Sequence, residues 1–117
     1  MIQTEKQYPL ITSDNCYLYI LATGEMQYYI GMAGNPKLAD NITYEKSKVS
    51  VKAAKQMPAK LVYYRCFEDT LSALGFKLLL EKLAPASVDR IIRRMNPTKQ
   101  DLSHLLQNNN NRHLNNF

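Results

Sequence analysis

Short apolar runs near the start and in the middle of the chain have the pattern of β-strands. The first run, residues 16–22, mixes aromatic and aliphatic side chains, and a second run at residues 27–32 follows it. The turn-forming residues 23–25 separate them, and two such runs joined by a tight turn predict a β-hairpin. A third run, residues 60–67, is β-branched and aromatic in its middle and predicts a third strand.

Helical patterns fill most of the remaining positions. Asn35 and Pro36 predict an N-cap and a first helical position for a helix that continues through residues 37–39. Residues 44–56 are basic with few apolar anchors, and they predict a short helix or an ordered loop that Pro58 ends.

The most apolar segment predicts the main helix of the domain. From about Thr70 to Leu83 the apolar positions wrap widely around a helix, which predicts that it packs on the sheet. Pro85 ends this helix, and two shorter helices follow before and after Asn96-Pro97. We therefore expect an α/β (α+β) fold with a three-stranded antiparallel sheet flanked by helices, in the order β-β-α-β-α-α-α.

Length and composition predict one soluble domain. The chain has 117 residues, of which 45% are hydrophobic, and no apolar run approaches the ~20 residues that a membrane helix needs. We expect a lead-in at residues 1–15, a domain at residues 16–106 and an Asn-rich tail at residues 107–117. Because the start lacks a secretory pattern, we expect a cytoplasmic protein in which Cys16 and Cys66 are buried thiols rather than a disulfide.

Positive charge is concentrated in the middle of the chain, whose formal net charge is +5. Residues 46–67 contain no acidic side chain and six basic ones: Lys46, Lys48, Lys52, Lys55, Lys60 and Arg65. A second basic cluster lies at residues 90–94. Segregated positive charge favours DNA or another polyanion, because basic side chains neutralise phosphates. The alternative is a solvated face that only keeps the protein soluble.

Two tyrosines lie ten residues apart on the two strands of the expected hairpin. Tyr19 ends the tripeptide Tyr17-Leu18-Tyr19, and Tyr29 begins the tripeptide Tyr29-Ile30-Gly31. With this spacing and element order, residues 16–84 resemble the GIY-YIG nuclease family, in particular its small single-domain branch. Further matches are Asn35-Pro36 before the first helix, Leu61-Val62-Tyr63 in the third strand and Ser72-Ala73-Leu74 in the next helix.

The resemblance implies a site for cleavage of a phosphodiester. In that family two tyrosines flank the scissile phosphate, an arginine stabilises the developing charge, and a glutamate holds one divalent metal ion. The matching positions in this chain are Tyr19, Tyr29, Lys37 and Lys77. Lys37 lacks the bidentate grip of an arginine, and Lys77 reverses the charge of the metal ligand.

The departures from the family pattern leave a degenerate catalytic site. We expect Tyr19, Tyr29, Lys37 and Lys77 to converge despite their separation in sequence. Glu81 is the acid nearest to Lys77 that could replace the metal ligand, but at the i, i+4 spacing it more simply pairs with Lys77.

Three functions remain open on this basis. The first is a DNA-binding protein that no longer cleaves and needs no cofactor, of the regulatory or interfering kind found in phages and mobile elements. The second is an active endonuclease or nickase that uses magnesium or manganese, with Glu81 as the recruited ligand. The third is a protein-interaction module that binds no nucleic acid, in which Tyr19 and Tyr29 only pack on the sheet. A homodimer or another protein partner is compatible with each.

Overall fold

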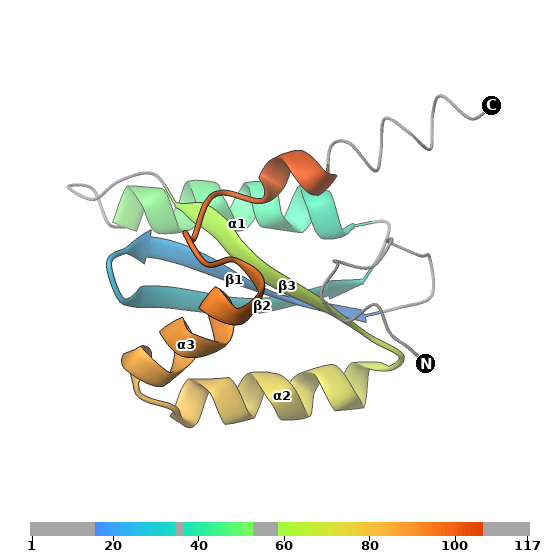
Figure 1. Cartoon of the computed structure of the whole chain (residues 1–117). Coiled ribbons are helices and arrows are strands. Elements are labelled where there is room, and N and C mark those ends of the chain that lie inside the picture. Colours follow the sequence, from blue (N-terminus) through green and yellow to red (C-terminus); the bar gives the residue numbers. More distant parts are fainter. Residues whose placement is uncertain (1–15, 35–36, 53–58, 107–117) are drawn as a thin grey trace.

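A three-stranded antiparallel sheet forms the centre of the molecule (Figure 1). The computed structural model describes residues 16–34, 37–52 and 59–106. The strands are β1 (Cys16–Gly24), β2 (Gln27–Gly34) and β3 (Lys60–Phe67), and they are ordered β2-β1-β3. β1 and β2 form the expected hairpin, with Gly24 opposite Gln27 across a tight turn. The antiparallel sheet predicted from the apolar runs is therefore confirmed.

The helices are α1 (Leu38–Lys52), α2 (Thr70–Lys82) and α3 (Pro85–Met95), followed by a helical turn at residues 103–106. This arrangement confirms the expected order β-β-α-β-α-α-α. One expectation needs correction, because residues 44–52 do not form a separate helix or loop. They continue the helix that begins at Leu38 and is described as far as Lys52, and the rest of the segment lies outside the described residues. The expected cap and first helical position, Asn35 and Pro36, lie outside the described residues, as do the lead-in and the tail.

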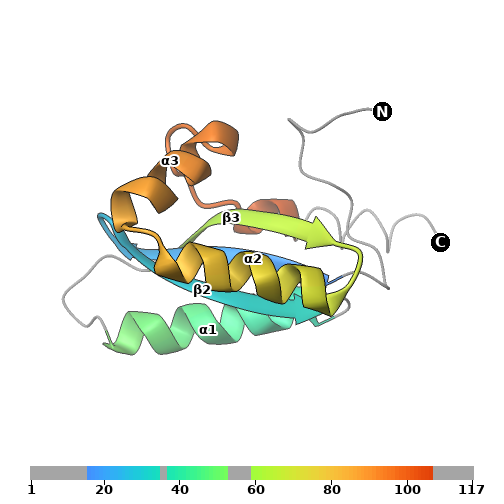
Figure 2. The same cartoon turned by 90° about the horizontal axis from the view of Figure 1, so that it is seen from below.

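Helices cover both faces of the sheet (Figures 1 and 2). Successive side chains of a strand point to opposite faces, so the central strand β1 supplies two separate cores. Tyr17, Tyr19 and Leu21 pack with residues of α1 and of the last helical turn. Leu18 and Ile20 pack with residues of α2 and α3 on the opposite face. Since both faces of β1 are buried, its sequence is an unbroken apolar run rather than an alternating one.

The C-terminal part of the domain covers the outer edge of β3. The Leu102 amide donates to the Leu61 carbonyl at 2.7 Å, and the Leu61 amide donates to Asp101 Oδ1 at 3.1 Å. Asn96, which is buried, donates from Nδ2 to the Val62 carbonyl at 3.0 Å. These bonds occupy backbone groups that an outer strand would otherwise present for pairing with another chain.

Two smaller expectations concern the cysteines and the membrane. Cys16 is buried and Cys66 half-buried, and no disulfide joins them. Within the described residues, no helix has the length and apolar character that crossing a membrane requires.

Candidate functional site

A pocket lies along the outer strand β2, between the helices that flank the sheet in Figure 2. Its volume is about 470 Å³. Strands β1 and β2, helices α1 and α2 and the start of α3 all line it. The polar side chains among its lining are Tyr19, Tyr28, Tyr29, Asn41, Glu45, Lys77 and Glu81. Three of the four residues expected to converge, the two tyrosines and Lys77, therefore share one pocket.

Tyr19 reaches this pocket because its cross-strand neighbour is a glycine. Tyr19 on β1 is paired with Gly31 on β2, and a Cβ atom added to Gly31 would lie 2.5 Å from the Tyr19 Cζ and hydroxyl oxygen. The phenol ring therefore lies across the backbone of β2, in the space that any other side chain would fill. Only a glycine at position 31 allows the hydroxyl of this otherwise buried tyrosine, 1% exposed, to reach the pocket.

Tyr29 contacts a carboxylate that comes from α1. Burial raises the pKa of the Tyr29 hydroxyl, and the negative charge of Glu45, its hydrogen bond with the phenol and the charge of Glu81 raise it further. Burial also raises the pKa of Tyr19 well above its ordinary range, with added contributions from Tyr29 and Glu45. Both phenols are therefore protonated at neutral pH. They can donate hydrogen bonds, but a general base needs a pKa near the working pH.

Lys77 and Glu81 form an ion pair on the flank of α2 that lines the pocket. Lys77 Nζ lies 2.8 Å from Glu81 Oε2, which is the pairing that their i, i+4 spacing predicts. A divalent metal does not fit this arrangement, because the ammonium group occupies the Glu81 carboxylate and would repel the ion. Within the described residues, moreover, no group of three or more His, Cys, Asp or Glu side chains is placed to hold a metal ion.

Lys37 does not line the pocket. It is exposed and precedes α1, and its carbonyl accepts the first helical hydrogen bond, from the Asn41 amide at 2.9 Å. Asn41 and Glu45 follow at intervals of four residues, so the three side chains lie on one side of α1. Asn41 and Glu45 reach the pocket, whereas Lys37 lies one turn nearer the helix start.

Glu45 is a charged residue of the pocket that the sequence did not single out. Its side chain is 17% exposed, and its Oε1 lies 3.8 Å from Lys48 Nζ. Within the described part of the chain this buried oxygen accepts no hydrogen bond. The four-residue spacing from Lys37 through Asn41 would have indicated Glu45, had the whole segment been taken as one helix.

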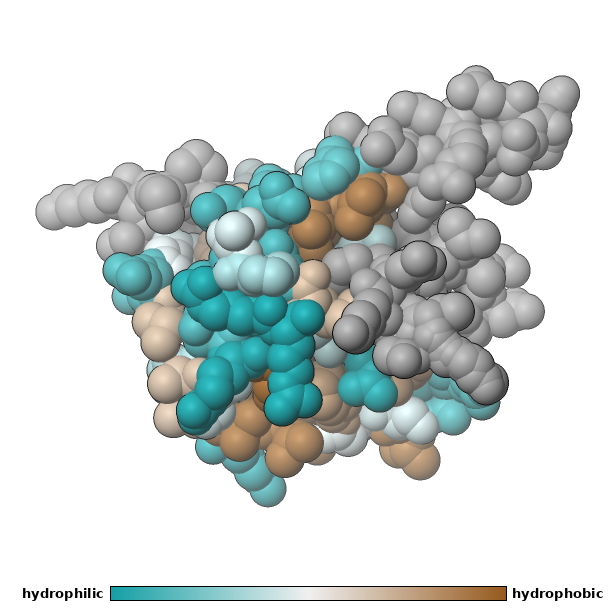
Figure 3. All heavy atoms as spheres, viewed as in Figure 1, coloured by the Kyte–Doolittle hydropathy of each residue, from teal (hydrophilic) through white to brown (hydrophobic). Residues whose placement is uncertain are grey.

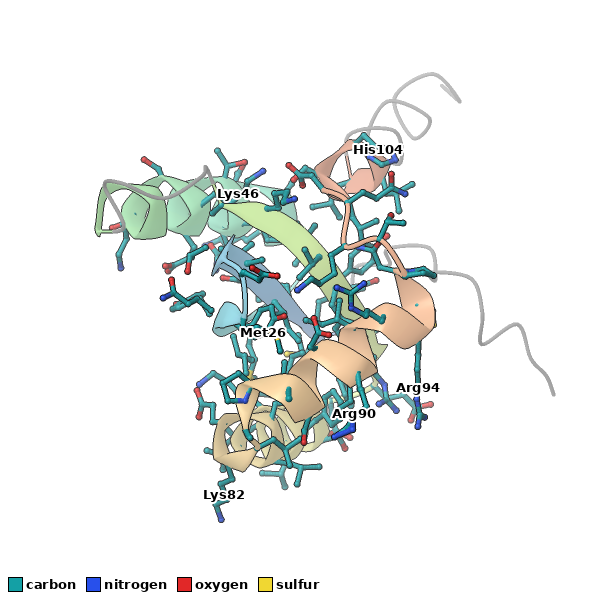
Figure 4. The ribbon with its side chains drawn as sticks, turned by 60° about the vertical axis from the view of Figure 1, so that its left-hand side comes forward. Met26, Lys46, Lys82, Arg90, Arg94 and His104 are labelled. Atoms are coloured by element: carbon teal, nitrogen blue, oxygen red, sulfur yellow. The ribbon has the colours of Figure 1, made fainter. Side chains whose placement is uncertain are left out.

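Of the six basic residues expected to contact nucleic acid, the four whose side chains are described do not line the pocket. Lys46 Nζ lies 3.0 Å from Asp101 Oδ2 and 3.0 Å from Ser103 Oγ, and Figure 4 shows it on the α1 side of the sheet. Lys48 lies over the Tyr44 ring, 5.3 Å from its centroid. The side chain of Lys52 and the whole of Lys55 lie outside the described residues.

The two basic residues on β3 lie away from the pocket, because β3 is the outer strand opposite β2. Lys60 lines a second cavity of about 240 Å³, at the hairpin end of the sheet, together with Arg93 and Lys99. The Arg65 guanidinium stacks on the rings of Phe67 and Phe76, with distances of 4.8 Å and 4.9 Å to their centroids. Arg65 therefore joins β3 to α2 through its stacked guanidinium.

Tyr28 is on the face of β2 opposite to Tyr29 and belongs to a structural network. Its hydroxyl donates to Asp89 Oδ1 at 2.9 Å and accepts from Lys99 Nζ at 2.7 Å. Asp89 also accepts from Arg93 Nε at 2.9 Å. These bonds hold α3 and the segment after it against the hairpin, and they fix the end of the pocket where α3 begins.

Comparison with protein-family models, curated proteins and solved structures finds no match for this chain. The resemblance to the GIY-YIG nucleases therefore rests on the residues described above. The placement of Tyr19, Tyr29 and Lys77 in one pocket is the structural observation that bears on it most directly.

Proposed function

We propose that the protein binds nucleic acid through the pocket along β2 and does not cleave it. One observation carries the proposal: the Lys77 ammonium lies in the same pocket as Tyr19 and Tyr29 and is paired with Glu81 at 2.8 Å. By the resemblance, position 77 is where a metal-binding glutamate would stand. An ammonium there offers a phosphate the positive charge that the metal would otherwise supply.

The protonated phenols give the pocket its second means of binding a phosphate. Because the pKa values of Tyr19 and Tyr29 are both raised, their hydroxyls are protonated at neutral pH and are hydrogen-bond donors, not bases. A bound phosphate would replace Glu45 as the acceptor for the Tyr29 hydroxyl. Within the pocket the charge of Lys77 is offset by Glu81, and Glu45 adds a second negative charge that lies near Lys48 outside it. Most of the long-range attraction for a polyanion must then come from the net charge of +5. A protein that occupies nucleic acid without cutting it suits the regulatory or interfering role expected from the sequence.

Gel retardation of short duplex and single-stranded DNA over a series of salt concentrations tests the binding. We expect affinity that falls steeply with salt, as phosphate contacts require. Tyr29→Phe and Lys77→Gln should each weaken binding about tenfold, the loss for one hydrogen bond to a charged group. Tyr44→Phe, on the exposed side of α1, and Arg94→Gln, on α3, are matched controls outside the pocket. Tyr44→Phe should bind as the wild type does, and Arg94→Gln should lose much less affinity than Lys77→Gln, because it removes a charge that lies outside the pocket.

The outcomes separate the alternatives. If no nucleic acid is retarded at low salt, the proposal is wrong and a protein-interaction module is favoured. If Tyr29→Phe binds as tightly as Tyr44→Phe, DNA does not use the pocket. Supercoiled plasmid incubated with magnesium or manganese should stay uncut.

Cleavage remains a second candidate because of one observation. The carboxylates of Glu45 and Glu81 both raise the pKa of the Tyr29 hydroxyl. They come from different helices on the two sides of the pocket. Mg²⁺ is often bound by one or two carboxylates together with substrate phosphates. Metal-dependent nicking by the wild type that disappears in both Glu45→Gln and Glu81→Gln would select this candidate over the first.

A further inference from the structure

The outward face of α2 is apolar although nothing in the described structure covers it. Leu71 is 77% exposed, Leu74 39%, Leu78 49% and Leu79 52%. Figure 3 shows hydrophobic side chains at the surface along the lower edge of the molecule, where Figure 1 places α2. The sheet uses the other face of this helix, through Ala73 and Leu80. The exposed leucines therefore take no part in the packing of α2 against the described part of the chain.

Two of these leucines are placed symmetrically about Gly75. Leu71 and Leu79 stand four residues before and after Gly75, so at about 100° per residue they lie roughly 40° to either side of it. A Cβ atom added to Gly75 would meet no atom within 4 Å. The centre of the face is consequently open and low, which allows the backbone of another helix to approach closely.

Charge follows the same symmetry with opposite signs at the two ends. Glu68 and Lys82 stand seven residues before and after Gly75, and both are exposed. Figure 4 shows Lys82 projecting from the end of α2 away from the sheet. When two such helices lie antiparallel and cross at Gly75, helical residues equally far from Gly75 lie at the same height, so Leu71 of one copy contacts Leu79 of the other. Glu68 lies just before the N-cap Asp69 and comes near Lys82 at the end of the other helix. Each pair occurs twice.

We propose that two copies of this chain associate through the outward faces of α2, antiparallel and centred on Gly75. A surface that is complementary to itself under a two-fold rotation is what a symmetric dimer requires. A partner of another kind would need neither the matched leucines nor the opposite charges at equal distances. One helix face is small beside a standard interface, so we expect dissociation in the micromolar range.

Sedimentation velocity over a concentration series, from low micromolar to several hundred micromolar, measures the association. The wild type should change from monomer to dimer across this range. Leu79→Glu, at an exposed position, should raise the midpoint concentration at least tenfold. Lys82→Glu should weaken association because it opposes Glu68 with a like charge. The double variant Glu68→Lys/Lys82→Glu should restore association towards the wild-type midpoint.

Cross-linking tests the antiparallel geometry. Under mild oxidation Gly75→Cys should form a disulfide-linked dimer, because the two positions face each other in the proposed arrangement. Ala86→Cys, an exposed position at the start of α3, is the matched control and should remain monomeric, as should the wild type with its own two cysteines. A wild type that stays monomeric at every concentration overturns the proposal. So does equal cross-linking of the two variants, or a charge reversal that the double variant does not rescue.

Discussion

A single glycine sets the geometry of the pocket at the residue scale. Gly31 provides the space over which the Tyr19 ring crosses β2, and both residues belong to the tripeptides that suggested the family. The resemblance rests on a sequence motif, and the glycine of Tyr29-Ile30-Gly31 has a steric reason in this structure. The glycine is required by the tyrosine opposite it and not by an unusual backbone angle, because Gly31 has no positive φ.

Replacement of this glycine tests that reason. Gly31→Ala should lower the free energy of unfolding by about 1–3 kcal/mol, the usual cost of overpacking a core, because the new methyl group overlaps the Tyr19 ring. Urea denaturation measures the change. Gly75→Ala is the matched control, and in dilute solution it should stabilise the chain by about 0.5–1 kcal/mol, since an exposed helical glycine gains helix propensity. Equal effects of the two substitutions would mean that Tyr19 does not need the space.

The tyrosines and Lys77 could be expected at one site from the sequence, whereas Glu45 could not. The hairpin spacing and the helix after β3 determine the first three positions. Glu45 lies in a segment whose weak apolar pattern left its helical state open, so the turn-by-turn relation to Asn41 was not apparent. Lys37, in contrast, was expected in the pocket and does not line it. The sequence places it on the correct side of α1, but it lies one turn too early to reach the pocket.

At the scale of the elements, the sequence predicts that α2 is a helix more firmly than it predicts which face is buried. Apolar residues occur all around α2, so the sequence pattern alone does not show which side of the helix packs on the sheet. The structure buries Ala73 and Leu80 and leaves the face around Leu71, Leu78 and Leu79 exposed. The sheet is narrow, with only three strands, so one side of a helix is all that its face can cover.

The junction between α3 and β3 depends on one buried amide. Asn96 donates from Nδ2 to the Val62 and Gln100 carbonyls, and its Oδ1 accepts from the Gln100 amide at 3.2 Å. Asn96→Ala removes these partners and should cost about 1–3 kcal/mol of the free energy of unfolding, because buried backbone groups lose their hydrogen bonds. Urea denaturation monitored by circular dichroism provides the measurement. Asn41→Ala, in the pocket, is the control and should change stability much less.

The attachment of α3 should also make stability depend on acid pH. The Lys99 ammonium holds the pKa of the Asp89 carboxyl well below its usual range, and Arg93 and Tyr28 add to this effect, while partial burial opposes it. The Asp89 carboxylate therefore takes up a proton less readily in the folded chain than in the unfolded chain. The contribution of the ionised Asp89 to stability is complete above the unfolded pKa of about 3.9 and is lost as the pH falls below that value.

Thermal denaturation between neutral pH and pH 3 measures this dependence. The melting temperature of the wild type should fall in the acidic part of the range. Asp89→Asn should melt lower at neutral pH and lose less on acidification, since the group that takes up the proton is gone. If the melting temperature of Asp89→Asn falls with acid as much as that of the wild type, carboxyl groups other than Asp89 cause the fall. Asp101 is the first to examine, because hydrogen bonds from Ser103, Lys46 and Leu61 outweigh the effect of burial and lower its pKa too.

For the whole molecule, the sequence predicts the amount of positive charge but not its distribution in space. The basic run from Lys46 to Arg65 crosses from α1 to β3, and those of its side chains that are described have separate partners. Lys46 pairs with Asp101, 55 residues away in the sequence, and Arg65 stacks on two phenylalanines. Partners of this kind come from distant segments, so counting charges along the chain could not reveal them. The net charge remains for long-range attraction, while selectivity would come from the pocket.

In the proposed function, the residue at position 77 determines whether the pocket binds a phosphate or a metal ion, and a single substitution tests this. In the wild type, the Lys77 ammonium would oppose a divalent ion by several kcal/mol at an effective dielectric constant near ~20. Lys77→Glu removes that repulsion and puts a third carboxylate in the pocket that Glu45 and Glu81 line. Three carboxylates can hold a hard cation such as Mn²⁺. We therefore expect the variant to bind Mn²⁺ and the wild type to show no appreciable binding, as measured by titration calorimetry.

DNA binding should change in the opposite direction. Without metal, Lys77→Glu should retard DNA less than the wild type, and added Mn²⁺ should recover part of the loss. Arg94→Glu makes the same change in charge outside the pocket, so it should acquire no Mn²⁺ site. Lys77→Glu alone should still not nick plasmid, because Lys37 lacks the bidentate grip on a phosphate. Slow nicking is expected only when Lys37→Arg is added. If the wild type bound Mn²⁺ as tightly as the variant does, this account would be contradicted, because the Lys77 ammonium would then not be repelling the ion from the pocket.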